Sequence, residues 1–270
     1  MKIVLIRNEA KYDVRHVAES ILKKLQHYGV EVVEENQKLT GAPNLILVLG
    51  GDGTIIRAAR QYGMQGIPLL GINMGTVGFL SNIEAGEIDL YIERLIQQNY
   101  FIEERMLLES TVFEYNQRVL FKETCINEVA VKSDSMRMIS ISLEVNGSSL
   151  GTYRGDGLIV ATPTGSTAYS LSAGGPISDP GLEALFITPI ACHNISRRPL
   201  VVGPGRILRL IPRDDGMLCF DGQVKIDLNK GSTIEIKKSP YTLRLADLKK
   251  KPYFETFETR LRRIESYFNG

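Results

Sequence analysis

The feature that most constrains the fold of this chain is a glycine-rich turn directly after a short apolar run. Residues 45–49 read Leu-Ile-Leu-Val-Leu, and residues 50–54 read Gly-Gly-Asp-Gly-Thr. A continuous apolar run of this length is typical of a strand in a parallel sheet that is covered on both faces. Glycine N–H groups at the start of a following helix can bind phosphate oxygens, because no Cβ keeps the ligand away. The turn therefore predicts an α/β fold with a phosphate site at the end of this strand.

Asp52 is the acidic residue of this turn. A carboxylate does not bind phosphate, so we interpret Asp52 as a general base or an acceptor for a substrate hydroxyl, with a metal-bound water as a further partner. An ordinary Asp-Gly turn is the structural alternative, because such turns are common. The chemistry of Asp52 therefore has to be judged together with the other motifs of the chain.

The first hundred residues alternate strand and helix patterns. Apolar residues recur at helical spacing over residues 14–25, Gly29 ends that pattern, and a further helix is expected over residues 89–98. Short apolar runs that predict strands occupy residues 3–6, 30–33, 45–49 and 69–72. This alternation favours an α/β domain whose parallel sheet is covered on both faces.

The pattern changes after about residue 101, where β-branched runs replace helical spacing. Asn146-Gly147 between two such runs is a hairpin signal, and Asp221-Gly222 and Lys230-Gly231 indicate further turns. The expected strands include residues 110–113, 139–145, 158–161, 207–211 and 233–236. We therefore predict a mainly antiparallel β domain, with a sandwich as the preferred architecture.

The end of the chain, residues 251–270, predicts a helix with one apolar face that packs on the first domain. We interpret the basic residues nearby, which include Arg260, Arg262 and Arg263, as a solvent-facing surface rather than a site for an acidic partner. The residues of the apolar face are Phe254, Phe257, Leu261, Ile264 and Phe268.

Composition and charge argue against several classes of function. The formal net charge of +1 gives no overall basic field for nucleic acid or a membrane surface. No apolar run reaches the ~18 residues that span a bilayer, and the first run is too short for a signal peptide, so we expect a cytoplasmic protein. The three cysteines form no Cys-x-x-Cys pair and the three histidines no ligand pair, which argues against redox and zinc chemistry.

A second glycine-bearing turn, residues 71–80, also follows a short apolar strand. Because open α/β sheets bind ligands beyond the carboxyl ends of their strands, we expect this turn and Asp52 at one edge of the sheet. Asn73 and Gly75 are its residues that we assign to the phosphate site. A tight turn that needs a positive φ is the structural alternative.

Hydroxyl groups and glycines are dense in residues 154–176. Residues 154–157 read Arg-Gly-Asp-Gly, and residues 162–170 read Thr-Pro-Thr-Gly-Ser-Thr-Ala-Tyr-Ser. Such groups can bind ribose, base edges and phosphate, and Tyr169 offers a ring face or a hydroxyl. A polar surface loop is the alternative. Asn127-Glu128, an amide beside a carboxylate, is a weaker signal for ribose hydroxyls, and Asp221-Gly222-Gln223 is by composition more typical of a hairpin turn.

Taken together, these motifs resemble the bacterial NAD kinase family over nearly the whole chain. The Gly-Gly-Asp-Gly-Thr turn alone is shared with lipid and sphingosine kinases and with phosphofructokinases. Residues 162–169, followed by Ser-Ala-Gly-Gly-Pro at 172–176, are far more specific to NAD kinases. The sequence has neither a P-loop nor a Gly-x-Gly-x-x-Gly motif opening a dinucleotide-binding helix, which disfavours hydride transfer.

The resemblance implies a Rossmann-like domain over residues 1–100, an NAD-binding β-sandwich over residues 101–250, and a C-terminal helix over residues 251–270. It implies phosphorylation of NAD by ATP on the 2′-hydroxyl of the adenosine ribose, giving NADP, with a divalent cation such as Mg²⁺ and with Asp52 as proton acceptor. Another nucleotide or polyphosphate as donor stays open. A dimer or tetramer is expected, with residues near Ala191 completing a neighbour's site.

Two alternatives are retained: a lipid or sphingoid kinase with the same turn, and a non-catalytic dinucleotide sensor. No metal ligands are assigned. The residues assigned to phosphate and ATP are Gly50, Gly51, Gly53, Thr54, Arg57, Asn73 and Gly75. The residues assigned to NAD are Asp52, Gly53, Asn127, Glu128, Arg154, Asp156, Thr164, Ser166, Thr167, Ala168, Tyr169, Ser170, Leu171, Ser172, Ala191 and Gln223.

Overall fold

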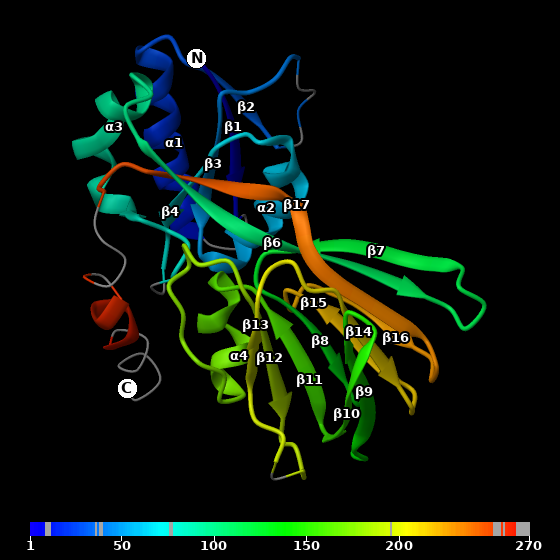
Figure 1. Cartoon of the computed structure of the whole chain (residues 1–270). Helices are drawn as coiled ribbons and strands as arrows, with labels where there is room; N and C mark the ends of the chain where they lie inside the picture. Colours follow the sequence, from blue (N-terminus) through cyan, green and yellow to red (C-terminus); the bar gives the residue numbers. More distant parts are fainter. Residues whose placement is uncertain are drawn as a thin grey trace. The chain divides into compact units, whose positions relative to one another are not determined.

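The computed structural model describes residues 1–8, 12–35, 37, 40–75, 78–194, 196–250, 255 and 257–262 (Figure 1). The chain divides into two compact units. Unit 1 comprises Met1–Glu104 and Leu243–Gly270, and unit 2 comprises Arg105–Thr242. Of the predicted apolar face of the terminal helix, Phe254, Ile264 and Phe268 lie outside the described residues, as does Arg263.

Unit 1 contains a parallel sheet in the order β17-β4-β3-β1-β2, with β5 beside β4. Its strands are β1 (Lys2–Arg7), β2 (Glu31–Glu34), β3 (Leu45–Gly50), β4 (Leu69–Asn73), β5 (Ile83–Glu84) and the end of β17 (Thr233–Asp247). Gly50 pairs with Asn73, so the carboxyl ends of β3 and β4 lie side by side. The two glycine-bearing turns therefore leave the sheet at the same edge, as predicted.

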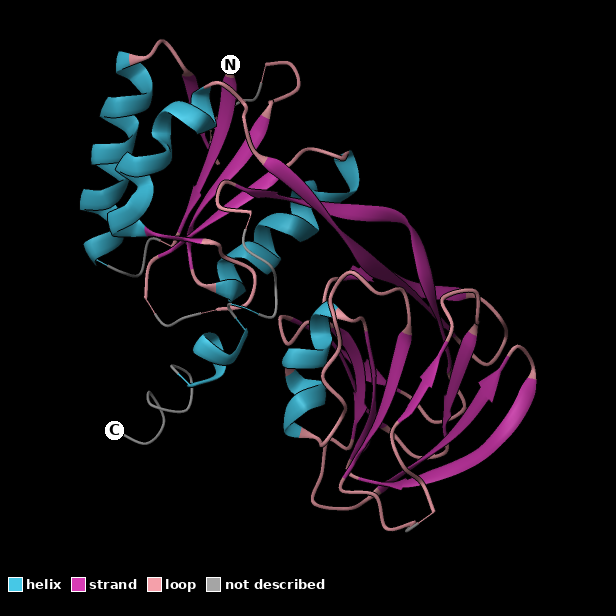
Figure 2. Cartoon of the chain, turned by 60° about the vertical axis from the view of Figure 1, so that its left-hand side comes forward, coloured by secondary structure: helices cyan, strands magenta, loops and turns pink. Residues whose placement is uncertain are grey.

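Helices cover both faces of this sheet, with α1 and α3 on one face and α2 on the other (Figures 1 and 2). Ile3 and Leu5 of β1 pack in the core shared with α1 and α3, whereas Val4 and Ile6 are equally buried on the opposite face. Burial on both faces explains why the strands are continuously apolar rather than alternating. The helices are α1 (Tyr12–His27), α2 (Asp52–Tyr62), α3 (Ile88–Ile96), and the short 3₁₀ turns η1 (Gly63–Gln65) and η2 (Ala85–Glu87).

Unit 2 is a sandwich of two mainly antiparallel sheets (Figure 2). Val131 of β8 and Ile141 of β9 belong to one buried cluster, so the two sheets share a core. One sheet has the order β13-β12-β11-β8-β15-β16, with β8 (Glu128–Lys132), β11 (Gly157–Ala161), β12 (Leu185–Ile190), β13 (Leu200–Val202), β15 (Gly216–Phe220) and β16 (Val224–Leu228). The other contains β6 (Phe101–Phe113), β7 (Val119–Cys125), β9 (Ile139–Val145), β10 (Ser148–Gly155), β14 (Leu208–Pro212) and β17. The predicted fold class is confirmed.

The outer face of the first sheet of unit 2 is covered by a short helical segment. Ile159 and Phe186 form a small buried cluster there, and Tyr169 packs against it. The segment consists of η3 (Thr164–Thr167) and α4 (Tyr169–Ser172). The polar run of residues 162–170 is therefore packed onto a sheet and is not a free surface loop.

The division between the units differs from the boundary expected at residue 250. Ile236 of β17 pairs with Leu208 of β14, whereas Leu245 near its other end pairs with Leu69 of β4. Residues 243–250 therefore belong to unit 1, because this long strand continues into the parallel sheet. The sequence pattern marked only residues 233–236 of it.

The hairpin expected at Asn146-Gly147 joins β9 and β10. Val145 pairs directly with Ser148, and the φ angles of Asn146 and Gly147 are 50° and 80°. A two-residue loop with both φ angles positive is a type I′ turn, whose twist matches that of the flanking strands.

We predict that Gly147→Ala lowers the free energy of unfolding by about 1 kcal/mol, because an L-residue with a side chain is strained at this φ. Gly86→Ala is the matched control, since no heavy atom lies within 4 Å of its Cβ position and its φ is not positive. Urea denaturation followed by circular dichroism measures both variants. Equal stability of the two variants would contradict the prediction.

Candidate active site

The carboxylate of Asp52 lies in the first turn of α2 and is held by the second glycine-bearing turn. Its Oδ2 accepts the backbone N–H of Phe79 at 2.8 Å, and its Oδ1 accepts that of Leu80 at 3.1 Å. A Cβ at Gly78 would overlap the carboxylate, so only glycine lets the chain pass this close. Asp52 is therefore fixed by backbone atoms and is not part of an ordinary solvent-exposed turn.

The surroundings of Asp52 act on its pKa in both directions. Burial is the largest influence and raises the pKa above its ordinary value of 3.8, while the Phe79 and Leu80 amides and the Arg260 guanidinium lower it. The net effect is a raised pKa. A carboxylate accepts a proton more readily when its pKa is closer to neutral pH, so this environment suits a general base.

The glycines around Asp52 have different surroundings. Gly51 precedes α2 in an extended conformation, and no heavy atom lies within 4 Å of its Cβ position. A Cβ at Gly50 would instead overlap the side chain of Thr54, which is itself buried. Gly53 is exposed on the first turn of the helix. Gly51 and Gly53 are therefore open to a ligand, whereas Gly50 is required by the packing of the helix on the strand.

Asn73 lies beside this turn, with a side chain that is 3% exposed. Its Nδ2 donates to Glu84 Oε2 at 3.0 Å, and its Oδ1 has no partner among the described residues. Gly75 is exposed in the turn that follows β4. Arg57, one turn further along α2, forms an ion pair with Glu35. The structure thus brings Asn73 to the end of β3 and directs Arg57 to Glu35.

In unit 2, Asn127 and Glu128 lie where β8 begins. Asp221 follows β15, the neighbouring strand, and its carboxylate accepts three backbone N–H groups. The donors are Ile126 at 3.0 Å, Asn127 at 2.7 Å and Glu128 at 3.1 Å. The turn at Asp221-Gly222 is therefore a hairpin turn, as its composition suggests, and also fixes the Asn127-Glu128 pair.

The first residues of the polar run 162–170 also hold the backbone beside Asn127 and Glu128. Thr162 donates its hydroxyl to the Ile126 carbonyl at 2.5 Å and its N–H to the Asn127 carbonyl at 2.8 Å. The Thr162 hydroxyl also accepts the N–H of Gly165 at 2.9 Å. A Cβ at Gly165 would overlap the Asn127 carbonyl. This part of the motif fixes the backbone of the pair.

Glu128 is 5% exposed, and its Oε2 has no hydrogen-bond partner in the described part of the chain. Burial, and then the charge of Asp221, raise the pKa of Glu128 to about 8, against the opposite effect of the Tyr169 backbone N–H. A buried polar atom without a partner is costly and is normally satisfied by water or a ligand. Glu128 is therefore able to hydrogen-bond a ligand hydroxyl.

The serines of the motif are satisfied within the protein. Ser166 accepts the N–H of Ser178 at 3.1 Å, and the hydroxyls of Ser170 and Thr188 lie 2.9 Å apart. Ser166 and Ser170 are both fully buried. Thr164 is also buried, whereas the remaining members of this predicted group are partly or fully exposed: Thr167, Ala168, Tyr169, Leu171 and Ser172.

Arg154, Asp156 and Ala191 lie at the opposite end of β11 from Asn127. The Asp156 N–H donates to the carbonyl of Ile190 at 3.0 Å, beside Ala191. The four residue steps of β11 correspond to about 14 Å. Gln223 is exposed, two residues after Asp221. The structure therefore divides the predicted NAD residues of unit 2 into two groups at the two ends of β11.

Arg260 does not face solvent, in contrast to the prediction from the sequence. It is partly buried, and its guanidinium donates to the carbonyls of Phe79 at 2.9 Å and Ser81 at 3.0 Å. The expectation of a solvent-facing side chain was wrong, because Arg260 lies three residues after Phe257 and so on the same helical face. That spacing was the signal available in the sequence. Arg262 is exposed and pairs with Glu258.

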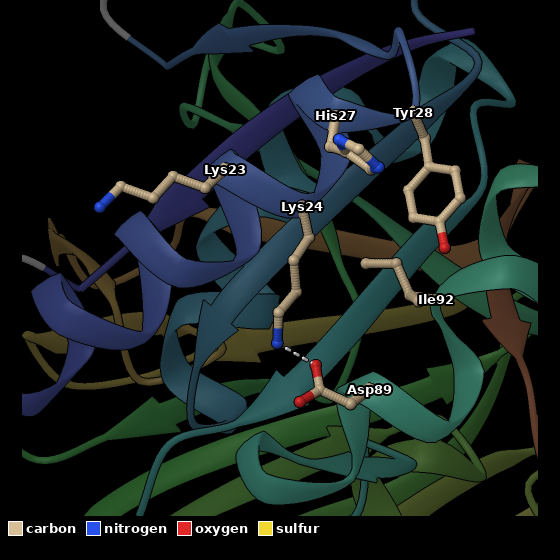
Figure 3. A pocket seen from close by; sticks show the side chains of 6 residues that line it. All are labelled: Lys23, Lys24, His27, Tyr28, Asp89 and Ile92. Carbon is tan, nitrogen blue, oxygen red and sulfur yellow. Dashed lines mark hydrogen bonds and ion pairs between the residues drawn. The ribbon is translucent and has the colours of Figure 1, made fainter.

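A pocket of about 410 Å³ lies elsewhere in unit 1, between α1 and α3 (Figure 3). The ammonium group of Lys24 points to the carboxylate of Asp89 and forms an ion pair with it. None of the predicted site residues lines this pocket, so it is separate from the candidate site. Its lining residues are Lys23, Lys24, His27, Tyr28, Asp89 and Ile92.

No cluster of three or more His, Cys, Asp or Glu side chains suited to a metal ion occurs in the ranges that the structure describes. Within the same ranges, no helix combines the length and the apolar character needed to cross a membrane.

Two family domains together match most of the chain. The ATP-NAD kinase N-terminal domain matches residues 4–100, and the ATP-NAD kinase C-terminal domain matches residues 126–248. The chain belongs to the ATP-NAD kinase family. Within this family, Asp52 lies in the N-terminal domain match, and Asn127, Glu128 and Asp221 lie in the C-terminal one.

Curated family members are similar over almost their full length. An NAD kinase from Natranaerobius thermophilus is 36% identical, covering 95% of this chain and 96% of the relative. An NAD kinase from Syntrophotalea carbinolica is 37% identical, covering 92% and 94%. The solved structure of an NAD kinase from Archaeoglobus fulgidus in complex with ATP has a TM-score of 0.80 at 28% identity, covering 97% and 99%. Yeast NADH kinase complexed with NADH has a TM-score of 0.87 at 23% identity, covering 95% of this chain and 85% of that one, and supports the fold alone.

We predict that Glu128→Gln removes a pH dependence of stability. The unfolded chain ionises Glu128 near its ordinary pKa of 4.5, whereas in the folded protein this pKa is about 8. The folded protein therefore binds more protons between these values, and wild-type stability falls as pH rises from about 4.5 to about 8. The variant should gain roughly 1–3 kcal/mol on wild type between pH 5 and pH 8.

Urea denaturation followed by circular dichroism at pH 5, 6.5 and 8 tests this prediction. Asp156→Asn, at an exposed carboxylate of the same unit, is the control and should keep the wild-type pH dependence. If Glu128→Gln loses stability with rising pH as steeply as wild type, the buried acid does not have the raised pKa.

Proposed function

We propose that this chain transfers the γ-phosphoryl group of ATP to the 2′-hydroxyl of the adenosine ribose of NAD, giving NADP and ADP, with Asp52 as the general base. Membership of the ATP-NAD kinase family makes the chain a kinase that acts on NAD. The acceptor hydroxyl and the role of each residue are the proposed part. The observation that carries the proposal is the fixed Asp52 carboxylate with its raised pKa at the start of α2.

The proposed chemical step is a single phosphoryl transfer. The bond from the 2′-oxygen to the γ-phosphorus forms as the bond from that phosphorus to the bridging oxygen of ADP breaks, and the hydroxyl proton passes to Asp52. Its two oxygens each accept one N–H, so each keeps a lone pair for the substrate hydroxyl. Because the transition state is loose, positioning and charge stabilisation supply most of the acceleration.

Gly51 and Gly53 are the residues that we propose for the phosphate oxygens of ATP. Gly51 has open space around its Cβ position and Gly53 is exposed, and both lie at the start of α2, where the helix dipole favours an anion. The orphaned Oδ1 of Asn73 is a further polar atom at the same edge. ATP is the donor in this family, as the ATP complex of the Archaeoglobus fulgidus relative illustrates. Polyphosphate or another nucleotide as an additional donor is not required by the site.

A divalent cation, which we take to be Mg²⁺, is part of the proposal. The described residues form no cage of three or more ligating side chains, and both Asp52 oxygens accept N–H groups. These residues suit a cation held mainly by phosphate oxygens and water, as Mg²⁺ usually is in kinases. Such a cation neutralises charge on the transferred group.

The arrangement of unit 2 supports an elongated acceptor. The predicted NAD residues form two groups separated by the length of β11, about 14 Å. A ligand that contacts Asn127 and Glu128 at one end and Asp156 at the other must be longer than a single nucleotide. In this proposal the unpartnered Glu128 oxygen binds a ribose hydroxyl, and residues 167–172 surround the adenosine.

The two alternative functions are less well supported. A lipid or sphingoid kinase needs an apolar slot for its acceptor, whereas the groups near β11 are polar, and the family match does not favour this alternative. A dinucleotide sensor would not need a fixed carboxylate with a raised pKa. We also propose a cytoplasmic location, from the apolar pattern of the sequence, and, from the resemblance, a dimer or tetramer in which residues near Ala191 complete a neighbour's site.

We predict that Asp52→Asn lowers turnover by roughly 10²- to 10⁴-fold while NAD still binds, because a positioned general base contributes on this scale. NADP formation from NAD, ATP and Mg²⁺ is followed with glucose-6-phosphate dehydrogenase, and NAD binding by calorimetry. Asp89→Asn, at an exposed carboxylate outside the site, is the control and should keep full activity. Near-normal turnover of Asp52→Asn would contradict the role of Asp52 as the base. Absence of NADP formation by the wild-type protein would contradict the proposed reaction.

We also predict opposite outcomes for alanine at two adjacent glycines. Gly51→Ala should weaken ATP binding with unchanged stability, because its Cβ meets no protein atom but occupies the phosphate approach. Gly50→Ala should lower stability, because its Cβ would overlap Thr54. Thermal unfolding and calorimetric titration with ATP distinguish the two variants. Unchanged ATP affinity of Gly51→Ala would contradict the phosphate assignment.

A further inference from the structure

Arg260 contacts the same short segment of backbone that holds Asp52. The N–H groups of Phe79 and Leu80 donate to the Asp52 carboxylate. The carbonyls of Phe79 and Ser81 accept hydrogen bonds from the Arg260 guanidinium at 2.9 and 3.0 Å. The two sides of one three-residue segment are therefore bound to the general base and to the C-terminal helical segment.

The contact of Arg260 with this turn extends beyond the two carbonyls. Its Nη2 also donates to Asn82 Oδ1 at 3.0 Å. Phe257, on the preceding turn of the same helical segment, packs on Phe79 with ring centroids 5.9 Å apart. A guanidinium that bridges three acceptors fixes a planar fork of hydrogen bonds, which the single point charge of a lysine cannot reproduce.

The position of this turn determines the position of the carboxylate. Both oxygens of Asp52 are fixed by neighbouring amides of the turn, and Gly78 passes so close that a Cβ there would overlap the carboxylate. A displacement of the turn would therefore remove the hydrogen bonds of Asp52 or bring the backbone into it. An interaction that fixes the position of this turn therefore also fixes the position of the Asp52 carboxylate.

We propose that Arg260 is a positioning residue for the phosphoryl transfer, which acts by clamping residues 79–82 onto Asp52. Arg260 touches neither substrate in this proposal, and the C-terminal helical segment is part of the catalytic apparatus through it. The inference rests on the proposed role of Asp52 as the base.

The charge of Arg260 has a second effect, on the protonation of Asp52. Among the charged side chains, Arg260 acts on the carboxylate and opposes the effect of burial on its pKa. Arg57, on the same helix as Asp52, is paired with Glu35, and Glu84 accepts a hydrogen bond from Asn73. Loss of the Arg260 charge should therefore leave Asp52 protonated up to a higher pH.

Three variants test the proposal. Arg260→Gln removes the charge and most of the fork, Arg260→Lys keeps the charge without the fork, and Arg262→Gln is the control on the exposed side of the same segment. The measured quantities are kcat, the KM values for NAD and ATP, and the pH profile of kcat/KM for NAD at saturating ATP. The acidic limb of that profile reports the ionisation of the base before NAD binds.

We expect Arg260→Gln to lower kcat by roughly 10- to 100-fold with little change in either KM, since misplacement of a catalytic group by about 1 Å has effects of this size. Its acidic limb should move to higher pH. Arg260→Lys should lose a similar factor in kcat, but its limb should move less than that of Arg260→Gln, because the positive charge beside Asp52 is kept. Arg262→Gln should match wild type in every measurement.

The result that overturns the proposal is an acidic limb of Arg260→Gln at the wild-type pH, whatever its kcat, because a purely structural role would lower kcat without moving the limb. A thermal unfolding midpoint well above the assay temperature excludes loss of folded enzyme as the cause of a low kcat. Asp52→Asn is measured in parallel. If Asp52→Asn is inactive while Arg260→Gln has wild-type kinetics, the proposed role of Arg260 is wrong and the proposed role of Asp52 is retained. If Asp52→Asn is fully active, the proposed base fails.

Discussion

The structure depends on carboxylates that accept backbone N–H groups from another segment of the chain. Asp52 accepts two such groups from the turn at residues 78–80, and Asp221 accepts three from residues 126–128. Charge-assisted hydrogen bonds of this kind are stronger than bonds between neutral groups. In each unit they attach an irregular segment to the end of a strand, where a regular sheet offers no further pairing. The positions of the candidate functional groups follow from these bonds.

Several glycines of the motifs serve this attachment rather than a ligand. At Gly78 and Gly165 a Cβ would overlap the Asp52 carboxylate and the Asn127 carbonyl, and at Gly50 it would overlap Thr54. Gly51, in contrast, has open space around its Cβ position. In the proposed function, the glycine-rich turns of this chain therefore combine two requirements, close approach of the backbone to its own side chains and access for a phosphate. Sequence alone does not separate them, because both requirements select the same residue.

The sequence predicted the local structure well, because the strands and turns are encoded by neighbouring residues. The run at residues 45–49 and the Asn146-Gly147 hairpin lie where their patterns placed them. The meeting of Gly50 and Asn73 followed from the parallel sheet. Arg260 and the length of β17 were not predicted, since each depends on partners about 180 residues away in the sequence. Asp221 was recognised only as a turn residue, because its three bonds to residues 126–128 leave no mark in the local composition.

Glu128 and Asp221 show how two neighbouring acids in one buried site can take different roles. Asp221 receives three N–H groups, an environment that suits an ionised carboxylate. Glu128 is left with an unpartnered oxygen, and the charge of Asp221 adds to the effect of burial on its pKa. One acid therefore fixes the backbone, and the other has a raised pKa, which favours its protonated form, a form that can both donate to and accept from a hydroxyl. In the proposed function, a protonated Glu128 would bind the ribose without placing a second negative charge beside a substrate that already carries phosphates.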